Sequence, residues 1–220
     1  MGLTTHSLKL IQKAIEANPN IKSVCELGAQ NLYIGGNEKK PPFANLYYEG
    51  KGIKYSCIDL SKDNGAMPLD LSEEQVFVTK YDLVTDFGTS EHVVQMHEYT
   101  TTSFHDGHIS SIYPKGEPKD IDLGFYNCWK NKHNMLSVGG IMVNENPKSG
   151  NWPAHGYSYV TKEFFTEIAK TNGYKIIELS EDAAMGNTKD GWNICCVLQK
   201  EKDKKFMSYE VFKRLDYHKS

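Results

Sequence analysis

Apolar residues recur at helical spacing near the start of the chain and then gather in short continuous runs. Leu8, Ile11, Ala14 and Ile15 lie three or four positions apart, which predicts an amphipathic helix over residues 5–17. Runs of apolar and β-branched residues predict strands, which cover residues 21–27, 53–58, 66–69, 81–87, 140–144, 174–179 and 192–199. A second amphipathic helix is predicted around Phe164 to Ala169, ending at Gly173.

Strands that alternate with helical segments indicate an α/β protein with a mostly parallel sheet. The last two runs are close enough in sequence to pair as a hairpin with a long loop. In such sheets a ligand binds beyond the carboxyl ends of the strands. Candidate chemistry is therefore expected in the segments that follow the strands, at residues 28–31, 59–60, 70–71, 88–92 and 146–157.

The composition of two further segments predicts their structural roles. Residues 95–122 are polar and contain Pro114 and Pro118, and a loop of this length inside a domain is typical of a functional lid. Residues 201–220 are interpreted as a short charged tail, and the lysines from Lys200 to Lys205 as a solvated turn. Both segments belong to a single domain over residues 1–220, because the chain has 220 residues and domains average about 150.

Composition and charge argue against nucleic acids and membranes as binding partners. The net charge of −3 offers no basic footprint for nucleic acid. No apolar run reaches the ~20 residues of a membrane-spanning helix, and residues 1–10 lack the order of a signal peptide, so a cytoplasmic protein is expected. Cysteines in strand-like runs, such as Cys195 and Cys196, are expected to be buried reduced thiols on opposite faces of a strand.

The ends of the first two strands indicate a nucleoside site. Gly28 allows a tight turn and the close approach of a ligand, and Asp59 can accept hydrogen bonds from two ribose hydroxyls. A dinucleotide site would require G-x-G-x-x-G after the first strand, whereas residues 28–33 read GAQNLY. A pyrophosphate cradle is therefore disfavoured.

Four motifs in order carry a family resemblance: VCELGAQ at 24–30, IDL at 58–60, PLDL at 68–71 and YDLVTDFGTSEHV at 81–93. With HNML at 133–136 and the glycines at 139–140, this series resembles class I S-adenosylmethionine-dependent methyltransferases over residues 20–200. The resemblance implies a Rossmann-like, seven-stranded, mostly parallel sheet with helices on both faces and one antiparallel strand from the C-terminal hairpin. Ala29 and Gln30 depart from the family, which usually carries more glycine in this loop.

The resemblance also implies how S-adenosyl-L-methionine would be held. Asp59 would bind the ribose hydroxyls, and Asp70 would accept from the adenine amino group. The remaining cofactor contacts implied by the resemblance are Leu60 and Leu71 around the adenine, Glu26, Gly28, Ala29 and Gln30 near the methionine part, and Phe87, Gly88 and Thr89 beside the sulfonium. Since the sulfonium already activates the methyl group, the protein mainly positions the acceptor.

A hydroxyl or amine acceptor also requires a base, and His92 is one candidate. It is expected to open a helix over the reactive end of the cofactor; the alternative is a histidine that braces Glu91 or the loop. The pair also resembles the end of a Glu-x-x-Glu-His metal site, but Gly88 stands in place of the first glutamate, so no metal is predicted there. Glu91 is assigned to the acceptor pocket.

His155 is the second candidate base, within the run NWPAHGY at 151–157. Trp152 and Tyr157 would provide an aromatic wall for a small polar acceptor such as a sugar; the alternative is a structural loop around a packed tryptophan. His105 and His108 invite a metal interpretation, but their spacing is not that of usual zinc sites, and histidines of a solvated lid are favoured.

The sequence thus predicts a methyltransferase that transfers the methyl group of S-adenosyl-L-methionine to a small hydroxyl- or amine-bearing metabolite. Two alternatives stay open. One is an oxidoreductase with a nucleotide cofactor on a similar fold, and the other is a protein that binds S-adenosyl-L-methionine without catalysis. Fold resemblance alone does not decide among these functions.

Overall fold

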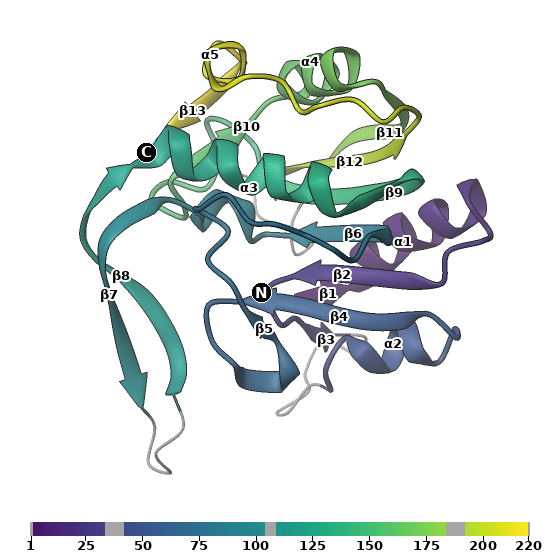
Figure 1. Cartoon of the computed structure of the whole chain (residues 1–220), viewed down its shortest axis with the longest axis horizontal. Coiled ribbons are helices and arrows are strands. Elements are labelled where there is room, and N and C mark those ends of the chain that lie inside the picture. Colours follow the sequence, from purple (N-terminus) through teal and green to yellow (C-terminus); the bar gives the residue numbers. More distant parts are fainter. Residues whose placement is uncertain (1, 34–41, 104–108, 184–191, 220) are drawn as a thin grey trace.

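The computed structural model describes residues 2–33, 42–103, 109–183 and 192–219. Seven strands form one sheet in the order β11-β12-β9-β6-β2-β4-β5, which Figure 1 shows from top to bottom. Only β12 runs antiparallel to its neighbours; the other pairs are parallel. The strands are β2 (Ser23–Leu27), β4 (Lys54–Asp59), β5 (Met67–Pro68), β6 (Tyr81–Phe87), β9 (Leu136–Pro147), β11 (Tyr174–Ala183) and β12 (Trp192–Lys200). The predicted fold class is confirmed.

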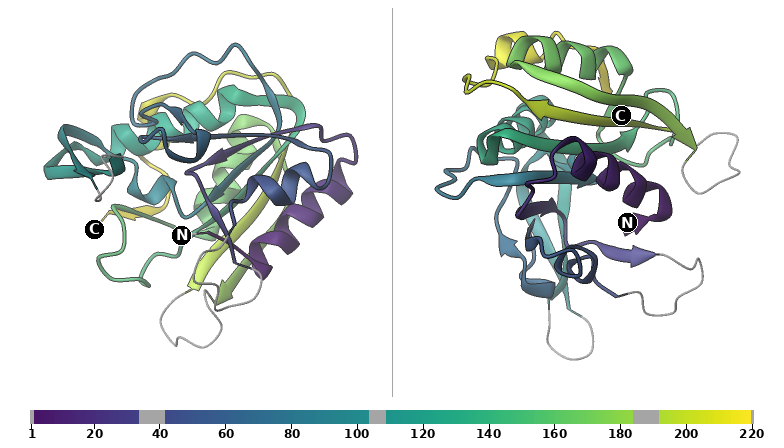
Figure 2. Two further views of the ribbon diagram at one scale, coloured as in Figure 1. Left: turned by 90° about the horizontal axis from the view of Figure 1, so that it is seen from below. Right: turned by 90° about the vertical axis from the view of Figure 1, so that its right-hand side faces the viewer.

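Helices cover both faces of this sheet (Figure 2). One apolar cluster joins α1 (Thr5–Ala17) and α2 (Asn45–Glu49) to side chains of β6, β9 and β12. The other joins α3 (Ile121–Met135), α4 (Lys162–Asn172) and α5 (Tyr209–Phe212) to alternate side chains of the same strands. Because successive strand residues point to opposite faces, Cys195 packs in the first cluster and Cys196 in the second, as expected.

Local signals explain where the predicted helices begin and end. Thr4 caps α1 by accepting from the backbone nitrogens of His6 and Ser7, and the Ser7 side chain completes a capping box. Thr161 caps α4 in a similar way, and Gly173 ends that helix in a left-handed conformation with φ 73°. Both helices therefore match the sequence prediction within a few residues.

The segment expected to be an irregular loop over 95–122 is a β-hairpin, so that expectation is wrong. Strands β7 (Gln95–Ser103) and β8 (Ile109–Asp120) pair antiparallel and project beyond the main sheet (Figure 1). Pro114 and Pro118 fit because a two-stranded ribbon leaves each strand an unpaired edge. His105 and His108 lie outside the described residues.

The C-terminal segment, predicted to be a short charged tail, packs on the core after an exposed turn at residues 201–205. Phe206, Met207 and Phe212 are buried in the core, and β13 (Tyr217–Lys219) pairs antiparallel with β10 (Ser158–Val160). Lys200, expected in a solvated turn, is buried, and its Nζ donates to the carbonyl oxygens of His133 and Leu136 at 3.0 and 3.2 Å. Interleaved apolar residues outweigh the charge pattern in this segment.

The chain around the first two strands also holds unpredicted short elements. β1 (Gly2–Thr4) pairs parallel with β3 (Asn31–Tyr33), so the chain after β2 continues as a strand. The helix expected at His92 is a single 3₁₀ turn, η2 (Ser90–His92), and another such turn, η1, spans Asp63–Gly65. Among the helices that the structure describes, none has the length and apolar character needed to cross a membrane.

A fully buried ion pair links α3 to the end of β6. Lys132 Nζ donates to Asp86 Oδ2 at 2.7 Å and to Asn144 Oδ1 at 2.8 Å, and it lies 3.3 Å from the ring centroid of Trp129. Burial by itself raises the pKa of Asp86, but the attraction of Lys132 and the hydrogen bonds outweigh it and lower the pKa below its ordinary value. Asp86 is therefore a charged carboxylate inside the core.

Removing the cation of this pair should be costly. Lys132→Met leaves the Asp86 carboxylate buried without its partner, which lowers the free energy of unfolding by about 3–5 kcal/mol. Lys170→Met is the matched control, since it removes an exposed pair with Glu167 worth less than about 1 kcal/mol. Denaturant unfolding of the three proteins measures both effects, and similar losses in the two variants would contradict the assignment.

Candidate functional site

A cavity of about 620 Å³ opens where the carboxyl ends of the parallel strands meet. The segments that follow β2, β4, β5, β6 and β9 all contribute to its wall. Its lining residues are Gly28, Ile58, Asp59, Leu60, Leu69, Asp70, Leu71, Thr89, His92, Val93, Val94, Tyr99, Ala154, His155, Gly156 and Tyr157. The cavity therefore lies at the edge of the sheet where the sequence predicted a ligand.

Nine residues assigned to the site from sequence line this cavity: Gly28, Asp59, Leu60, Asp70, Leu71, Thr89, His92, His155 and Tyr157. Seven others lie outside its lining: Glu26, Ala29, Gln30, Phe87, Gly88, Glu91 and Trp152. Most of these are buried behind the wall, where they hold the lining residues in place.

Asp59 and Gly28 are held together at the ends of β4 and β2. Asp59 Oδ2 accepts from the backbone nitrogen of Ala29 at 3.1 Å, and Oδ1 accepts from that of Ser61 at 3.1 Å. Gly28 has φ 74°, and a Cβ there would lie 2.8 Å from Gln30 Nε2 and 2.9 Å from Thr89 Oγ1. A larger residue would therefore strain the turn and crowd the loop.

Asp70 has a partner that the sequence interpretation missed. Its Oδ2 accepts from the hydroxyl of Tyr99 at 2.9 Å, and its Oδ1 accepts from the backbone nitrogen of Ser72 at 2.8 Å. Tyr99 comes from β7, within the segment taken for a loop. The β-branched run at residues 100–102, directly after the tyrosine, is the signal that predicts a strand there.

Glu26 lies in the core rather than on the cavity wall. Its Oε2 accepts from the Tyr55 hydroxyl at 2.6 Å and from the backbone nitrogen of Gln30 at 3.3 Å, and Tyr48 donates to Oε1 at 3.5 Å. Burial raises the pKa of Glu26 to about 8, against an ordinary value of 4.5. Through Gln30 this side chain fixes the loop that follows β2.

Gln30 and Thr89 tie the first loop to the end of β6. The Thr89 hydroxyl donates to the carbonyl oxygen of Leu27 at 2.9 Å, and Gln30 Nε2 donates to the same oxygen at 3.2 Å. Phe87 is buried in the cluster that contains α1, on the same face of β6 as Leu83. Phe87 therefore supports the wall from behind.

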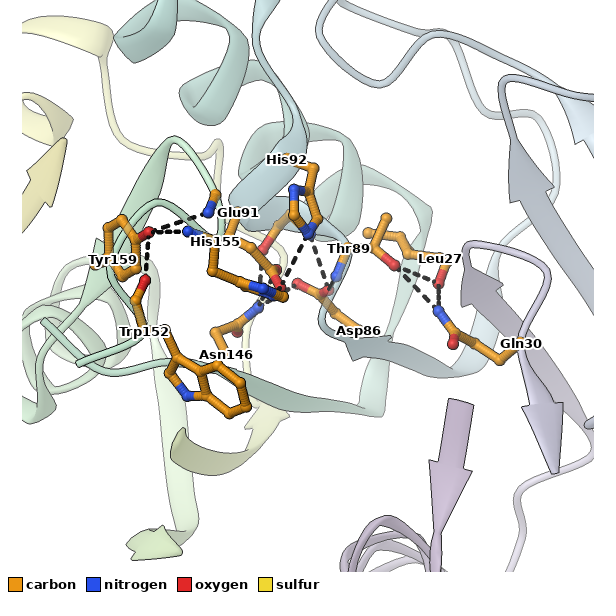
Figure 3. Close-up of polar contacts among 12 residues, drawn as sticks. Leu27, Gln30, Asp86, Thr89, Glu91, His92, Asn146, Trp152, His155 and Tyr159 are labelled. Atoms are coloured by element: carbon orange, nitrogen blue, oxygen red, sulfur yellow. Dashed lines mark hydrogen bonds and ion pairs between the residues drawn. The ribbon is translucent and has the colours of Figure 1, made fainter. Parts of the chain in front are cut away.

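Asp86 holds the turn that carries Glu91 and His92 (Figure 3). Its Oδ1 accepts from the backbone nitrogens of Thr89 and Ser90 at 3.2 and 3.1 Å. Asn146 on β9 donates through Nδ2 to Ser90 Oγ at 3.1 Å and to Glu91 Oε2 at 3.4 Å. The turn is thus fixed from both sides by buried polar groups.

The loop that carries His155 is built around Tyr159. The Tyr159 hydroxyl accepts from the backbone nitrogens of His155 and Gly156 at 2.9 and 3.0 Å and donates to the carbonyl oxygen of Trp152 at 2.9 Å. Trp152 and Ala154 both have positive φ, 55° and 58°, which is unusual for residues with a Cβ. The fold therefore stabilises a strained conformation in this loop.

Glu91, His92 and His155 meet where the turn and the loop touch (Figure 3). Glu91 Oε1 lies 3.7 Å from Nε2 of His92 and 3.7 Å from Nε2 of His155, and the two imidazole rings are 5.1 Å apart. Glu91 is buried, whereas both histidines are partly exposed. Burial of the ring lowers the pKa of His92, although the Glu91 charge opposes that shift.

The two histidines were predicted on separate segments of the sequence, and the structure brings them onto one wall. Glu91 was assigned to the acceptor pocket, but its side chain lies behind the histidines. The Trp152 ring lies beside that of His155, with ring centroids 5.2 Å apart and the planes tilted by 41°, and it does not line the cavity. Tyr157 does line it, and its backbone nitrogen donates to the Glu91 carbonyl oxygen at 2.8 Å.

Comparison with solved structures identifies the fold as that of class I methyltransferases. The 1,6-didemethyltoxoflavin-N1-methyltransferase of Burkholderia thailandensis has a TM-score of 0.56 at 11% identity, over 88% of this chain and 77% of that one. The N-methyltransferase NodS of Bradyrhizobium japonicum has a TM-score of 0.54 at 10% identity, over 89% and 85%. An O-methyltransferase from a Brevibacillus brevis multienzyme has a TM-score of 0.50 at 10% identity, over 92% and 74%.

The likeness to these proteins is one of fold, at 10–11% sequence identity. No protein-family model and no curated protein sequence matches the chain. All three solved structures contain S-adenosylhomocysteine.

The raised pKa of Glu26 predicts a pH-dependent stability. Between pH 4.5 and about 8 the folded chain keeps a proton on Glu26 that the unfolded chain releases. This contribution is fully present below pH 4.5 and is lost as the pH rises through about 8. The free energy of unfolding should therefore fall more steeply with pH in the wild type than in Glu26→Gln. Denaturant unfolding at several pH values tests this, and parallel profiles would exclude it.

Proposed function

We propose that this chain is an S-adenosyl-L-methionine-dependent methyltransferase that acts on a small polar acceptor. The observation that carries the proposal is one cavity whose lining combines two kinds of chemistry. Asp59 and Asp70 line it together with apolar side chains, and so do His92, His155 and Tyr157. The carboxylates with apolar neighbours suit a nucleoside, and the histidines suit an acceptor that must lose a proton.

The carboxylates and apolar residues would hold the nucleoside. Asp59 would accept from the ribose hydroxyls with lone pairs that Ala29 and Ser61 leave free. Asp70, held by Tyr99, would accept from the adenine amino group between Leu60 and Leu71. The methionine part of the cofactor would be supported by Glu26, Gly28, Ala29 and Gln30. The side of the cofactor that carries the sulfonium would be supported by Phe87, Gly88 and Thr89.

Removal of the acceptor proton would fall to the group formed by Glu91, His92 and His155. Both imidazoles line the cavity, so either could reach a bound hydroxyl or amine. The similar structures are described as N- and O-methyltransferases, and both chemistries need such a step. A small acceptor is favoured because the volume of about 620 Å³ must also hold the cofactor.

The two alternative functions have less support. An oxidoreductase with a dinucleotide would need a pyrophosphate cradle, but the loop after β2 has Gln30 and Tyr33 where the second and third glycines of G-x-G-x-x-G would stand. A protein that only binds the cofactor would not require histidines on the cavity wall. The proposed cytoplasmic location is supported by five buried cysteines that form no disulfide in the described part of the chain, which fits a reducing compartment.

Cofactor binding tests the proposal directly. Calorimetry should show binding of S-adenosyl-L-methionine and S-adenosylhomocysteine and no binding of NAD. Asp59→Ala should weaken the binding of both sulfur nucleosides by about 1.5–3 kcal/mol, because a charged acceptor of two hydrogen bonds is lost. Asp216→Ala, which removes an exposed carboxylate elsewhere, is the control. NAD binding without any response to either sulfur nucleoside would refute the proposal.

Turnover tests the role of the histidines. With an acceptor found among small hydroxyl- and amine-bearing metabolites, His155→Gln or His92→Gln should lower the single-turnover rate by roughly 10²–10⁴. The affinity for S-adenosylhomocysteine and the melting temperature should change little, because both side chains are partly exposed. If both variants keep near-native rates, catalysis proceeds by positioning alone and the assignment fails.

A further inference from the structure

The contact between Glu91, His92 and His155 has the composition of a metal site. One carboxylate oxygen and two imidazole nitrogens, one from each residue, all lie within 4.8 Å of one another. We propose that these three side chains bind a divalent cation of the zinc class at the wall of the cavity. The catalytic use of this cation rests on the proposed function, whereas the binding itself does not.

The charge balance of the core supports a cation at this place. Asp86 and Lys132 neutralise each other at 2.7 Å, which leaves Glu91 as a further buried carboxylate. Its Oε2 accepts from Asn146, but Oε1 has no hydrogen bond within the described part of the chain. A buried carboxylate oxygen that accepts no hydrogen bond is costly, so a cation beside it would stabilise the fold.

The distances between the ligand atoms also fit a tetrahedral metal site. In a tetrahedral zinc site, bonds of ~2.1 Å place neighbouring ligand atoms ~3.4 Å apart. Glu91 Oε1 lies 3.7 Å from each of the two Nε2 atoms, too far for a hydrogen bond and close to the ligand spacing. The ligand atoms of the two histidines lie within 4.8 Å of each other, so binding a cation would draw the two imidazoles toward Glu91 and toward each other.

The surrounding structure holds these ligands in place. Tyr159 fixes the backbone at His155, and a Cβ on Gly156 would lie 2.9 Å from Glu91 Cγ, so the loop packs directly on the glutamate. Asp86 and Asn146 fix the turn on the other side. Such supporting contacts are typical of metal sites, where they orient the ligands.

Ligand chemistry selects the class of cation. Two imidazoles and one carboxylate suit zinc and similar transition metals, whereas magnesium and calcium prefer oxygen ligands. Three protein ligands leave a position open, as in catalytic zinc sites, and both histidines line the cavity. An acceptor hydroxyl or amine that binds there would lose its proton more readily, and the imidazoles would then act as ligands instead of bases.

A second group of possible ligands, His6, Glu145 and Cys195, does not share these features. Both oxygens of Glu145 already accept hydrogen bonds, from Ser7 at 3.0 Å and from Asn193 at 3.1 Å. None of the three residues lines the cavity. The unpartnered oxygen therefore distinguishes Glu91 from Glu145.

Metal binding by the full-length chain, prepared without a polyhistidine tag and stripped with a chelator, tests the proposal. Zn²⁺ is titrated by calorimetry, and Co²⁺ by the visible absorption that reports tetrahedral coordination. One equivalent of either ion should bind to the wild type. Glu91→Gln and His155→Ala should each weaken binding by roughly tenfold or more. His97→Ala, which removes an exposed histidine of β7, should leave binding unchanged.

Each outcome has a definite meaning. Absence of Zn²⁺ and Co²⁺ binding, or binding that Glu91→Gln and His155→Ala leave unchanged, overturns the metal site. The melting temperature, measured on the same samples, shows whether each variant is folded, and the affinity for S-adenosylhomocysteine tests the proposed function separately. Metal binding without any affinity for sulfur nucleosides would refute the proposed function and leave the metal site standing. Binding of sulfur nucleosides without metal binding would overturn the metal site and leave the proposed function standing.

Discussion

The buried charge of Asp86 is the constraint on which the rest of the site depends. One oxygen of this carboxylate is paired with Lys132 from α3, and the other accepts from the backbone of the turn after β6. The pair therefore connects a helix, the central strand and the turn that presents Glu91 and His92. Because a buried carboxylate needs these partners, the turn cannot move without exposing a charge to an apolar core.

Hydrogen bonds connect the turn after β6 to the neighbouring segments on both sides. Asn146 connects the turn to β9, and the loop after β9 returns His155 to the same place. On the other side, Thr89 and Gln30 share the carbonyl oxygen of Leu27 and join β6 to the loop after β2, whose Gly28 lines the cavity. Cavity-lining segments on both sides are thus connected to the end of β6.

The sheet could be predicted from sequence because its strands are short apolar runs with clear ends. Residues 81–87 match β6, and Asp59 lies at the end of β4 as expected. The hairpin β7–β8 was missed because polar residues and two prolines masked its pairing. The C-terminal segment was misread because the lysines were weighed more heavily than Phe206 and Phe212, which are buried by tertiary contacts.

The sequence predicted the site residues that directly follow strands, but not the contacts between distant segments. Motifs that follow strands, such as Gly28 and Asp70, appear in sequence order and can be placed by the topology of the sheet. Contacts between distant segments leave no such pattern. Tyr99 reaches Asp70 from a hairpin, and Lys132 reaches Asp86 from a helix. The spacing of Glu91 and His155 likewise gives no indication that both lie at one point.

A crystal structure with S-adenosylhomocysteine tests the central claim most directly, namely that one cavity holds the cofactor and presents its reactive end to the two histidines. The account predicts the ribose hydroxyls at Asp59, the adenine amino group at Asp70, and the sulfur facing His92 and His155. Binding outside this cavity, or in the reverse orientation with the adenine against His155, would contradict it.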